Sequence, residues 1–216
     1  MTKKPGLGRV ELYQELKRWN LSAHDPGANK LVEDELWKKL GRKRAVLISD
    51  LSGFTRITRS KGILHFLAIF ERAHEIGEVV FARHGGRFLK TQADNLFALF
   101  DTVGAAAACA QAMLHEADKL NAQVPLADGH VRFCVGIGFG EILELADDAF
   151  GDQVNVAFKL GEDIAEPGQI LISEPAAADL RLSLAQKDLA TQLHDPTTVE
   201  VGHVELLYWH LPPLKG

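Results

Sequence analysis

Two acidic residues stand where folding can present them to a cation. Asp50 follows an apolar run, residues 45–48, that is typical of a buried strand, and a helix start follows it. A carboxylate fixed at a strand end can hold a cation, while free backbone N–H groups at a helix start can face an anion. These N–H groups belong to Ser52, Gly53, Phe54 and Thr55. On its own, the stretch indicates a helix-capping acid more often than a metal and phosphate site.

The second acid is Asp94, at the tip of an expected hairpin. Strands are predicted over 87–92 and 95–100, with only Ala93 and Asp94 between them. If this hairpin shares a sheet with the strand that ends in Asp50, the two carboxylates meet, and an apposed acid pair requires a cation or a shared proton. Mg²⁺ binds through few carboxylates and leaves room for substrate phosphates. The pair therefore predicts a divalent-metal site that handles phosphate.

The elements that must position these acids form a mixed set of helices and strands. Apolar periodicity separates helical from extended segments, and glycine and proline mark the turns between them. A helical region at 54–84, divided at Gly62, is expected before the hairpin, and an alanine-rich helix from Asp101 or Thr102 to about 121 after it. The elements expected next are a loop at 123–129, a hairpin of 130–138 with 141–145, and a loop with Asp147 and Asp148. The last are a helix at 151–164, a strand at 169–173, a helix at 174–185 and a strand pair at 200–211.

Residues 1–41 are expected to form a helical extension, and 42–216 one compact domain. Residues 1–8 are typical of a loose tail, and two short amphipathic helices follow. Their expected apolar faces are Val10, Tyr13, Leu16 and Leu21 in the first helix, and Leu31, Leu36, Trp37 and Leu40 in the second, which opens at Asn29 or Lys30. Such faces can dock on the main domain, a second copy or a regulator, and the main domain is the simplest partner.

Composition narrows the class of protein. The 216 residues carry a formal net charge of −5 without a basic tract, which argues against a nucleic-acid binder. Cys109 and Cys134 are predicted to be buried free thiols, which favours a reducing compartment. The start has no apolar signal segment, and Asp101 interrupts the one long apolar tract, so we expect a cytoplasmic protein that does not enter a membrane.

Four separated blocks carry a resemblance to a known family: VLISDLSGFT, GGRFLKTQADNLFALF, VRFCVGIGFGEI and AFGDQVNVAFKLGEDIAEPGQILIS. Together they resemble the class III nucleotidyl cyclase catalytic domain of adenylate and guanylate cyclases, over about residues 42–212. The resemblance implies an α+β fold with a ferredoxin-like βαββαβ palm-type core. It also implies a head-to-tail dimer with substrate between the subunits, two divalent cations, Mg²⁺ or Mn²⁺, and conversion of a nucleoside triphosphate to its 3′,5′-cyclic monophosphate and pyrophosphate.

The resemblance also implies roles for single residues. Asp50 and Asp94 match the metal-binding aspartates, the Leu51 carbonyl a backbone ligand, Lys90 and Asp148 the base-reading pair of adenylate cyclases, Asn155 the ribose-orienting residue, and Lys159 the position of the transition-state arginine. An ammonium and a carboxylate complement the N1 acceptor and 6-amino donor of adenine, so ATP is the expected substrate. Without the resemblance, Lys90 and Asp148 are typical surface residues, and Asn155 and Lys159 a polar helix stripe.

Three positions depart from the family pattern. Lys159 occupies the position where the family has an arginine, and Ala93 the position where it has a glycine. Residues 199–204 lack the lysine that binds the triphosphate in many cyclases, and the nearest lysine is Lys187. The first departure predicts a slow enzyme, because lysine lacks the two-pronged donor of arginine. Two alternatives follow: a non-catalytic cyclase-like module that binds nucleotide or a partner, and an enzyme that cleaves another phosphate ester.

Overall fold

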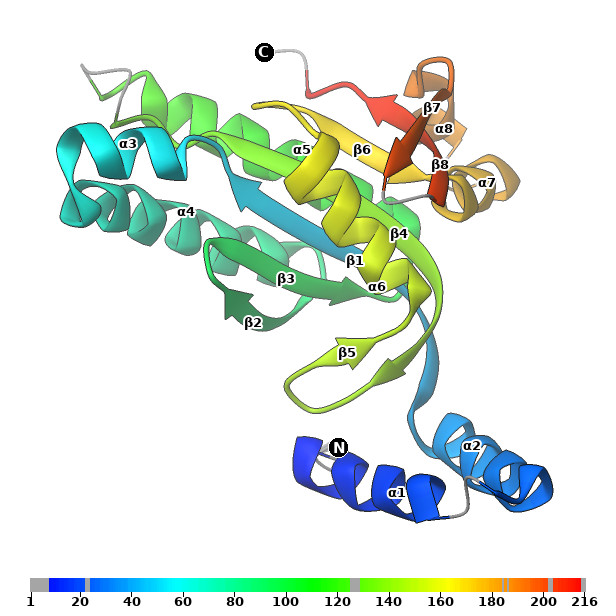
Figure 1. Ribbon diagram of the computed structural model, residues 1–216. Helices are drawn as coiled ribbons and strands as arrows, with labels where there is room; N and C mark the ends of the chain where they lie inside the picture. Colours follow the sequence, from blue (N-terminus) through cyan, green and yellow to red (C-terminus); the bar gives the residue numbers. More distant parts are fainter. Residues whose placement is uncertain are drawn as a thin grey trace.

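A single mixed β-sheet organises the protein (Figure 1). The structure, a computed structural model, describes residues 8–21, 24–124, 129–183, 185, 187–201 and 204–214. Along the sheet the strand order is β2-β3-β1-β4-β6-β8-β7, and β5 pairs with β4. The strands are β1 (Gly41–Leu51), β2 (Arg87–Gln92), β3 (Asn95–Phe100), β4 (Phe133–Glu144), β5 (Ala149–Phe150), β6 (Ile170–Ser173), β7 (Thr197–Val201) and β8 (Val204–Leu211).

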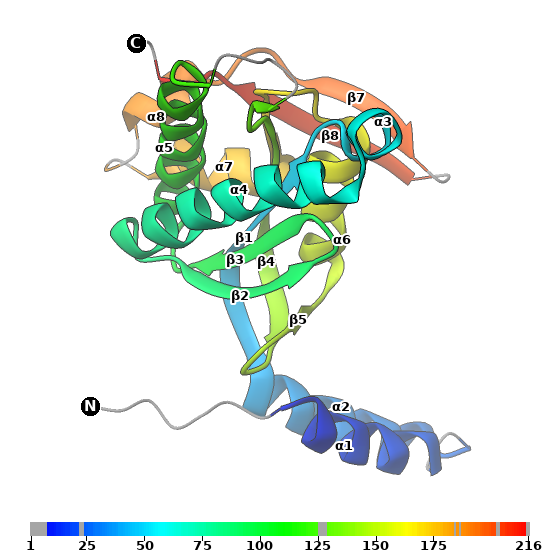
Figure 2. The same ribbon diagram turned by 90° about the vertical axis from the view of Figure 1, so that its left-hand side faces the viewer.

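Helices cover both faces of this sheet. The larger core lies under α4, α5 and α7, and the smaller one under α6 (Figures 1 and 2). The helices of the main domain are α3 (Phe54–Lys61), α4 (Ile63–Arg83), α5 (Val103–Asn121), α6 (Asp152–Phe158), the π-helix η2 (Lys159–Ile164), α7 (Glu174–Leu182) and α8 (Lys187–Gln192). The predicted α+β class with a palm-type core is confirmed.

The first half of the sequence prediction agrees closely with these elements. The bounds of β2 and β3 are those expected, Gly62 divides α3 from α4, and the hydroxyl of Thr102 caps α5 by accepting from the Ala105 N–H at 3.2 Å. The apolar run before Asp50 pairs with β3 on one side and β4 on the other. Asp50 therefore lies at the end of a central strand, which is a rigid position.

The prediction was wrong at β4, which is one continuous strand and not a hairpin of 130–138 with 141–145. The glycines of this segment were expected to allow close backbone approach, and they do. They let α6 pack against the strand, because a Cβ atom on Gly136 would lie 2.2 Å from the Ala157 carbonyl oxygen, and one on Gly138 would lie 2.2 Å from that of Gln153. The turn falls later, at residues 145–148, between β4 and β5.

The N-terminal extension forms α1 (Arg9–Leu21) and α2 (Pro26–Leu40), but the predicted apolar faces are confirmed only in part, at Leu36 and Leu40. Residues Val10, Tyr13, Leu16, Leu21, Leu31 and Trp37 are exposed. The predicted Leu36 and Leu40 pack against Leu145 together with Leu12 and Val32, which were not predicted to be buried. The second helix starts earlier than predicted, because Asp25 caps it, accepting from the N–H groups of Gly27 and Ala28, and Pro26 suits its first turn.

Smaller differences lie in the second half. Helix α7 ends at Leu182, earlier than expected, α8 was not predicted, and β7 begins at Thr197. Residues 1–7, 125–128 and 202–203 lie outside the described residues, and with them the expected tail, most of the 123–129 loop and part of the 199–204 segment.

Cys109 and Cys134 are buried free thiols, and burial raises the pKa of each to about 12. Among the described helices, none combines the length and apolar character needed to cross a membrane.

Candidate active site

The fold brings Asp50 and Asp94 together. Asp50 is at the end of β1, paired with Cys134 of β4, and Asp94 is in the turn between β2 and β3. Burial, and after it the nearby charge of Asp94, raise the pKa of Asp50 to about 6, with a smaller contribution from Glu162. Burial also raises the pKa of Asp94. The carboxylates are thus partly desolvated and close enough to repel each other.

This arrangement fits a divalent cation. Two carboxylates that repel each other in a partly desolvated position are stabilised by a hard cation, and Mg²⁺ needs only one or two of them besides phosphate and water oxygens. The carbonyl of Leu51 follows directly in the chain, at the end of β1. No larger group of three His, Cys, Asp or Glu side chains that could hold a metal occurs among residues 8–21, 24–124, 129–183, 185, 187–201 and 204–214.

The helix start after Asp50 departs from the prediction in one respect. Gly53 adopts φ 99°, which suits glycine, and precedes α3 as its N-cap residue. The N–H of Ser52, however, donates to the Arg132 carbonyl at 3.0 Å, so it is not free to bind an anion. The exposed ring of Phe54 packs edge-on against Phe66 with centroids 4.7 Å apart. Gly53, Phe54 and the exposed Thr55 remain predicted contacts.

Lys90 and Asp148 also come together, from β2 and from the turn after β4. The ammonium lies 2.7 Å from Asp148 Oδ1, and the Ala149 N–H donates to the same oxygen at 2.9 Å. The Asp148 side chain is only 3% exposed. Although burial alone would raise its pKa, these contacts and one from Arg9 hold the pKa below its ordinary value. The two predicted base-reading residues thus form a buried ion pair within one chain.

Arg9 also contacts the candidate site, which its place in the sequence does not indicate. Its guanidinium, on α1, donates to Asp148 Oδ2, the second oxygen of the predicted base-reading carboxylate. An isolated arginine near the start of a surface helix carries no sequence signal for a contact with a residue so distant in the chain. The extension therefore reaches the candidate site directly.

Asn155 and Lys159 lie one turn apart on α6 and at the start of η2. The Lys159 N–H donates to the Asn155 carbonyl, so the expected common helix face is present. Asn155 is exposed and Lys159 half-buried. Neither side chain has a hydrogen-bond or ion-pair partner within the described part of the chain.

Ala93 is strained, as the sequence implied. Its φ is 53°, the one positive φ found for a non-glycine residue in the described chain. A β-carbon disfavours this left-handed conformation. The turn that presents Asp94 therefore forms despite the alanine.

A mixed palm-type sheet, an acid pair at the end of its central strand and a Lys–Asp pair nearby resemble the arrangement of class III nucleotidyl cyclase catalytic domains. Known proteins agree with this class. The chain is 32% identical over 134 residues to the "Putative adenylate cyclase 3" of Rhizobium meliloti (strain 1021), covering 62% of this chain and 22% of that protein. It is 32% identical over 139 residues to the "Adenylate cyclase" of Streptomyces coelicolor, covering 64% and 34%. The chain thus spans about a third or less of these relatives.

Solved structures give the same result for the fold. A structure titled "Adenylate/Guanylate Cyclase/Hydrolase" from Silicibacter pomeroyi matches with a TM-score of 0.66 and 28% identity, over 80% of this chain and 98% of that one. The adenylyl cyclase CyaB from P. aeruginosa matches with a TM-score of 0.64 and 17% identity, over 81% and 97%. No family model matches the chain. The resemblance seen in the sequence is confirmed.

Proposed function

We propose that this protein is a cytoplasmic adenylate cyclase that works as a head-to-tail homodimer. The ribose 3′ oxygen of ATP attacks the α-phosphorus, the bond from that phosphorus to the pyrophosphate oxygen breaks, and the 3′ proton passes to solvent. The products are 3′,5′-cyclic AMP and pyrophosphate. The observation that carries the proposal is the meeting of Asp50 and Asp94 within a cyclase fold.

Asp50, Asp94 and the Leu51 carbonyl would hold two divalent cations, Mg²⁺ or Mn²⁺. When bound, such cations supply a more acidic 3′ hydroxyl and neutralise charge on the phosphates. The remaining work is positioning and electrostatic stabilisation. Asn155 orients the ribose, and Lys159 donates to the phosphate as its charge develops.

Base selection falls to Lys90 and Asp148. Lys90 donates to N1 of adenine and Asp148 accepts from the 6-amino group, whereas guanine presents the opposite pattern at these positions. The ion pair at 2.7 Å keeps the two groups mutually oriented. ATP is therefore favoured over GTP.

A second copy of the chain completes each site. Every proposed group is present in one chain, so a symmetric head-to-tail pair contains two equivalent sites without any other protein. We assign the metal acids of one subunit and the Lys90–Asp148 and Asn155–Lys159 groups of the partner to the same substrate.

The extension acts as a regulator in this proposal. Arg9 occupies one oxygen of Asp148, the group that must accept from adenine, so α1 competes with the base. Substituting Arg9→Ala should raise kcat/KM for ATP several-fold. The matched control is Arg18→Ala on the same helix, whose partners Glu15 and Glu35 belong to the extension itself. A lower kcat/KM in the Arg9 variant would instead make Arg9 a support for Asp148.

The decisive test is a product assay. Purified protein with ATP and Mn²⁺ or Mg²⁺ should yield cyclic AMP, and Asp50→Ala should abolish it. No cyclic product from the natural protein would favour a non-catalytic cyclase-like module. Release of inorganic phosphate without cyclic product would point to cleavage of another phosphate ester.

A further inference from the structure

A β-bulge in β2 changes which residues share a face with Lys90. The pairing of β2 with β3 shifts between Phe88 and Lys90, so that Arg87 is opposite Leu99 and Lys90 opposite Phe97. Phe97 and Leu99 both belong to the core beneath α6. In a regular strand, residues three apart point to opposite faces, but the extra residue of a bulge restores the same face. Arg87 therefore stands beside Lys90.

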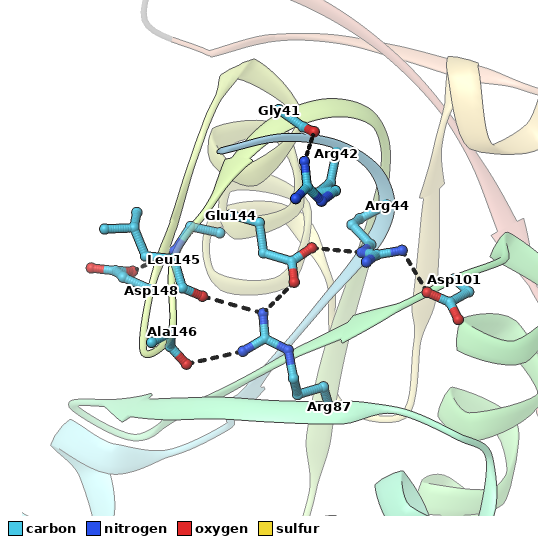
Figure 3. Close-up of polar contacts among 10 residues, drawn as sticks. Gly41, Arg42, Arg44, Arg87, Asp101, Glu144, Leu145, Ala146 and Asp148 are labelled. Atoms are coloured by element: carbon cyan, nitrogen blue, oxygen red, sulfur yellow. Dashed lines mark hydrogen bonds and ion pairs between the residues drawn. The ribbon is translucent and has the colours of Figure 1, made fainter. Parts of the chain in front are cut away.

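The Arg87 side chain donates hydrogen bonds to backbone carbonyl groups of the turn that carries Asp148 (Figure 3). One terminal nitrogen donates to the Ala146 carbonyl at 3.0 Å. The other donates to the Leu145 carbonyl at 3.3 Å and to Glu144 Oε1 at 2.8 Å. Strand β2 thus attaches to this turn at two points, by Arg87 to the backbone and by Lys90 to the carboxylate.

Glu144 in turn is fixed from the other side. Its Oε2 accepts from Arg44 Nε of β1 at 2.6 Å, and Arg44 also contacts Asp101 (Figure 3). The side chains of Glu144 and Arg44 are 17% and 19% exposed, so their ion pair is screened less than a surface pair. A carboxylate between two guanidinium groups orients the arginine that holds the turn.

We propose that Arg87, oriented by Glu144 and Arg44, is a positioning residue for base selection. This inference rests on the proposed function. The Arg87 guanidinium serves three acceptors, two of them carbonyl oxygens in the turn that ends at Asp148. Without it the turn loses these donors, and among the described residues only Lys90, the Ala149 N–H and Arg9 then contact the carboxylate. Discrimination between adenine and guanine then weakens, because it depends on the position of that carboxylate.

The test compares Arg87→Ala with Arg42→Ala, which removes the same charge from a side chain that donates to its neighbour's carbonyl, that of Gly41. The first readout is amide hydrogen exchange at Leu145 and Ala149, whose N–H groups donate to Asp148 within the turn. Arg87→Ala should speed this exchange about tenfold, and Arg42→Ala should not. Unchanged exchange in Arg87→Ala overturns the proposal.

The second readout is the ratio of kcat/KM for ATP to that for GTP. It should fall about tenfold in Arg87→Ala and stay constant in Arg42→Ala. Faster exchange with an unchanged ratio would overturn the role in base selection. If the natural protein makes no cyclic product, the proposed function fails and base selection with it, while the exchange data still decide whether Arg87 holds the turn. Arg87→Lys covers the case in which Arg87→Ala does not fold, because it retains the charge but not the forked donors, and its exchange should also be faster.

Discussion

The Lys90–Asp148 region and the Asp50–Asp94 region differ in whether their charged side chains are paired with opposite charges. At the first, the Asp148 carboxylate is almost fully enclosed and contacted by Lys90, Arg9 and a backbone N–H, and its pKa is lowered. At the second, two acids repel each other, their pKa values are raised, and the neighbouring Glu162 adds further negative charge.

This difference separates stability from function. Removing a charge that the fold already pairs leaves its partner buried and unpaired, which costs stability. Removing an unpaired charge relieves a cost in the free protein and affects only what binds there. Lys159, which has no polar side-chain partner among the described residues, belongs to the second group. The following predictions test this division, from the largest expected effect to the smallest.

After the loss of activity expected for Asp50→Ala, the largest effect is expected at Lys159. Substitution by alanine should lower kcat about a hundredfold to a thousandfold, because one preorganised donor to the reacting phosphate is lost, without reducing the free energy of unfolding. Substitution by arginine should raise kcat, because a planar fork holds two oxygens. Steady-state cyclic AMP formation measures both. Equal turnover of all three proteins would show that Lys159 has no role in the transition state.

Substitutions in the Lys90–Asp148 region should change nucleotide specificity. The double substitution Lys90→Glu and Asp148→Cys should lower the ratio of ATP to GTP use about a hundredfold, because it removes both groups complementary to adenine. It should also lower the melting temperature, since Arg9 loses its partner. Asp147→Cys, a change at the exposed neighbouring acid, is the control. An unaltered nucleotide preference would remove the assignment of the pair to the base.

The stability of the protein should depend on pH through the titration of Asp50. Its pKa of about 6 in the folded protein exceeds its ordinary value of 3.8, so the folded state retains the proton longer. Without divalent cations, stability should therefore fall as the pH rises from about 4 to 6. The rise from 3.8 to about 6 corresponds to about 3 kcal/mol, which solvent screening of this partly exposed side chain reduces to about 2 kcal/mol. Asp50→Asn should therefore be more stable by about 2 kcal/mol above that pH range and equally stable below it. Added Mg²⁺ should raise the melting temperature of the natural protein only. A less stable Asp50→Asn protein at pH 8 would contradict the unpaired state of this acid.

The smallest effect is expected at Ala93. Glycine should stabilise the protein by up to about 1 kcal/mol, because it adopts the φ of 53° without steric cost, while its extra freedom in the unfolded chain offsets part of the gain. Ala68→Gly, on the exposed face of α4, should lower the free energy of unfolding by about the same amount. Thermal unfolding compares the two. A destabilised Ala93→Gly protein would mean that the turn is not strained.

Local patterns were sufficient to predict the elements that carry the acids. The apolar run before Asp50 and the two-residue turn at Asp94 each have a short-range signal, and one shared sheet makes them meet. The predicted hairpin within β4 failed because a glycine permits both a turn and close packing, and only α6 decides which of these occurs. Sequence separation hid the contacts of Arg9 and Arg87, since no periodicity relates them to the turn before β5.

The N-terminal prediction identified Leu36 and Leu40 but not Leu12 and Val32 as buried. All four pack against Leu145 of the main domain, a tertiary contact that no periodicity within the two helices indicates. The division into residues 1–41 and 42–216 stays a prediction, and so do the roles of Asn155 and Lys159.

A mixing experiment tests the shared site most directly. Asp50→Ala lacks the proposed metal site, and Lys159→Ala lacks a group that we assign to the other subunit of the same site. Each variant alone should be nearly inactive. Mixed in equal amounts and allowed to exchange subunits, half of the dimers should be mixed and contain one intact site of two, so activity should recover to about a quarter of the natural level. No recovery, when mixed dimers are shown to form, would contradict a catalytic site built from two copies of this chain.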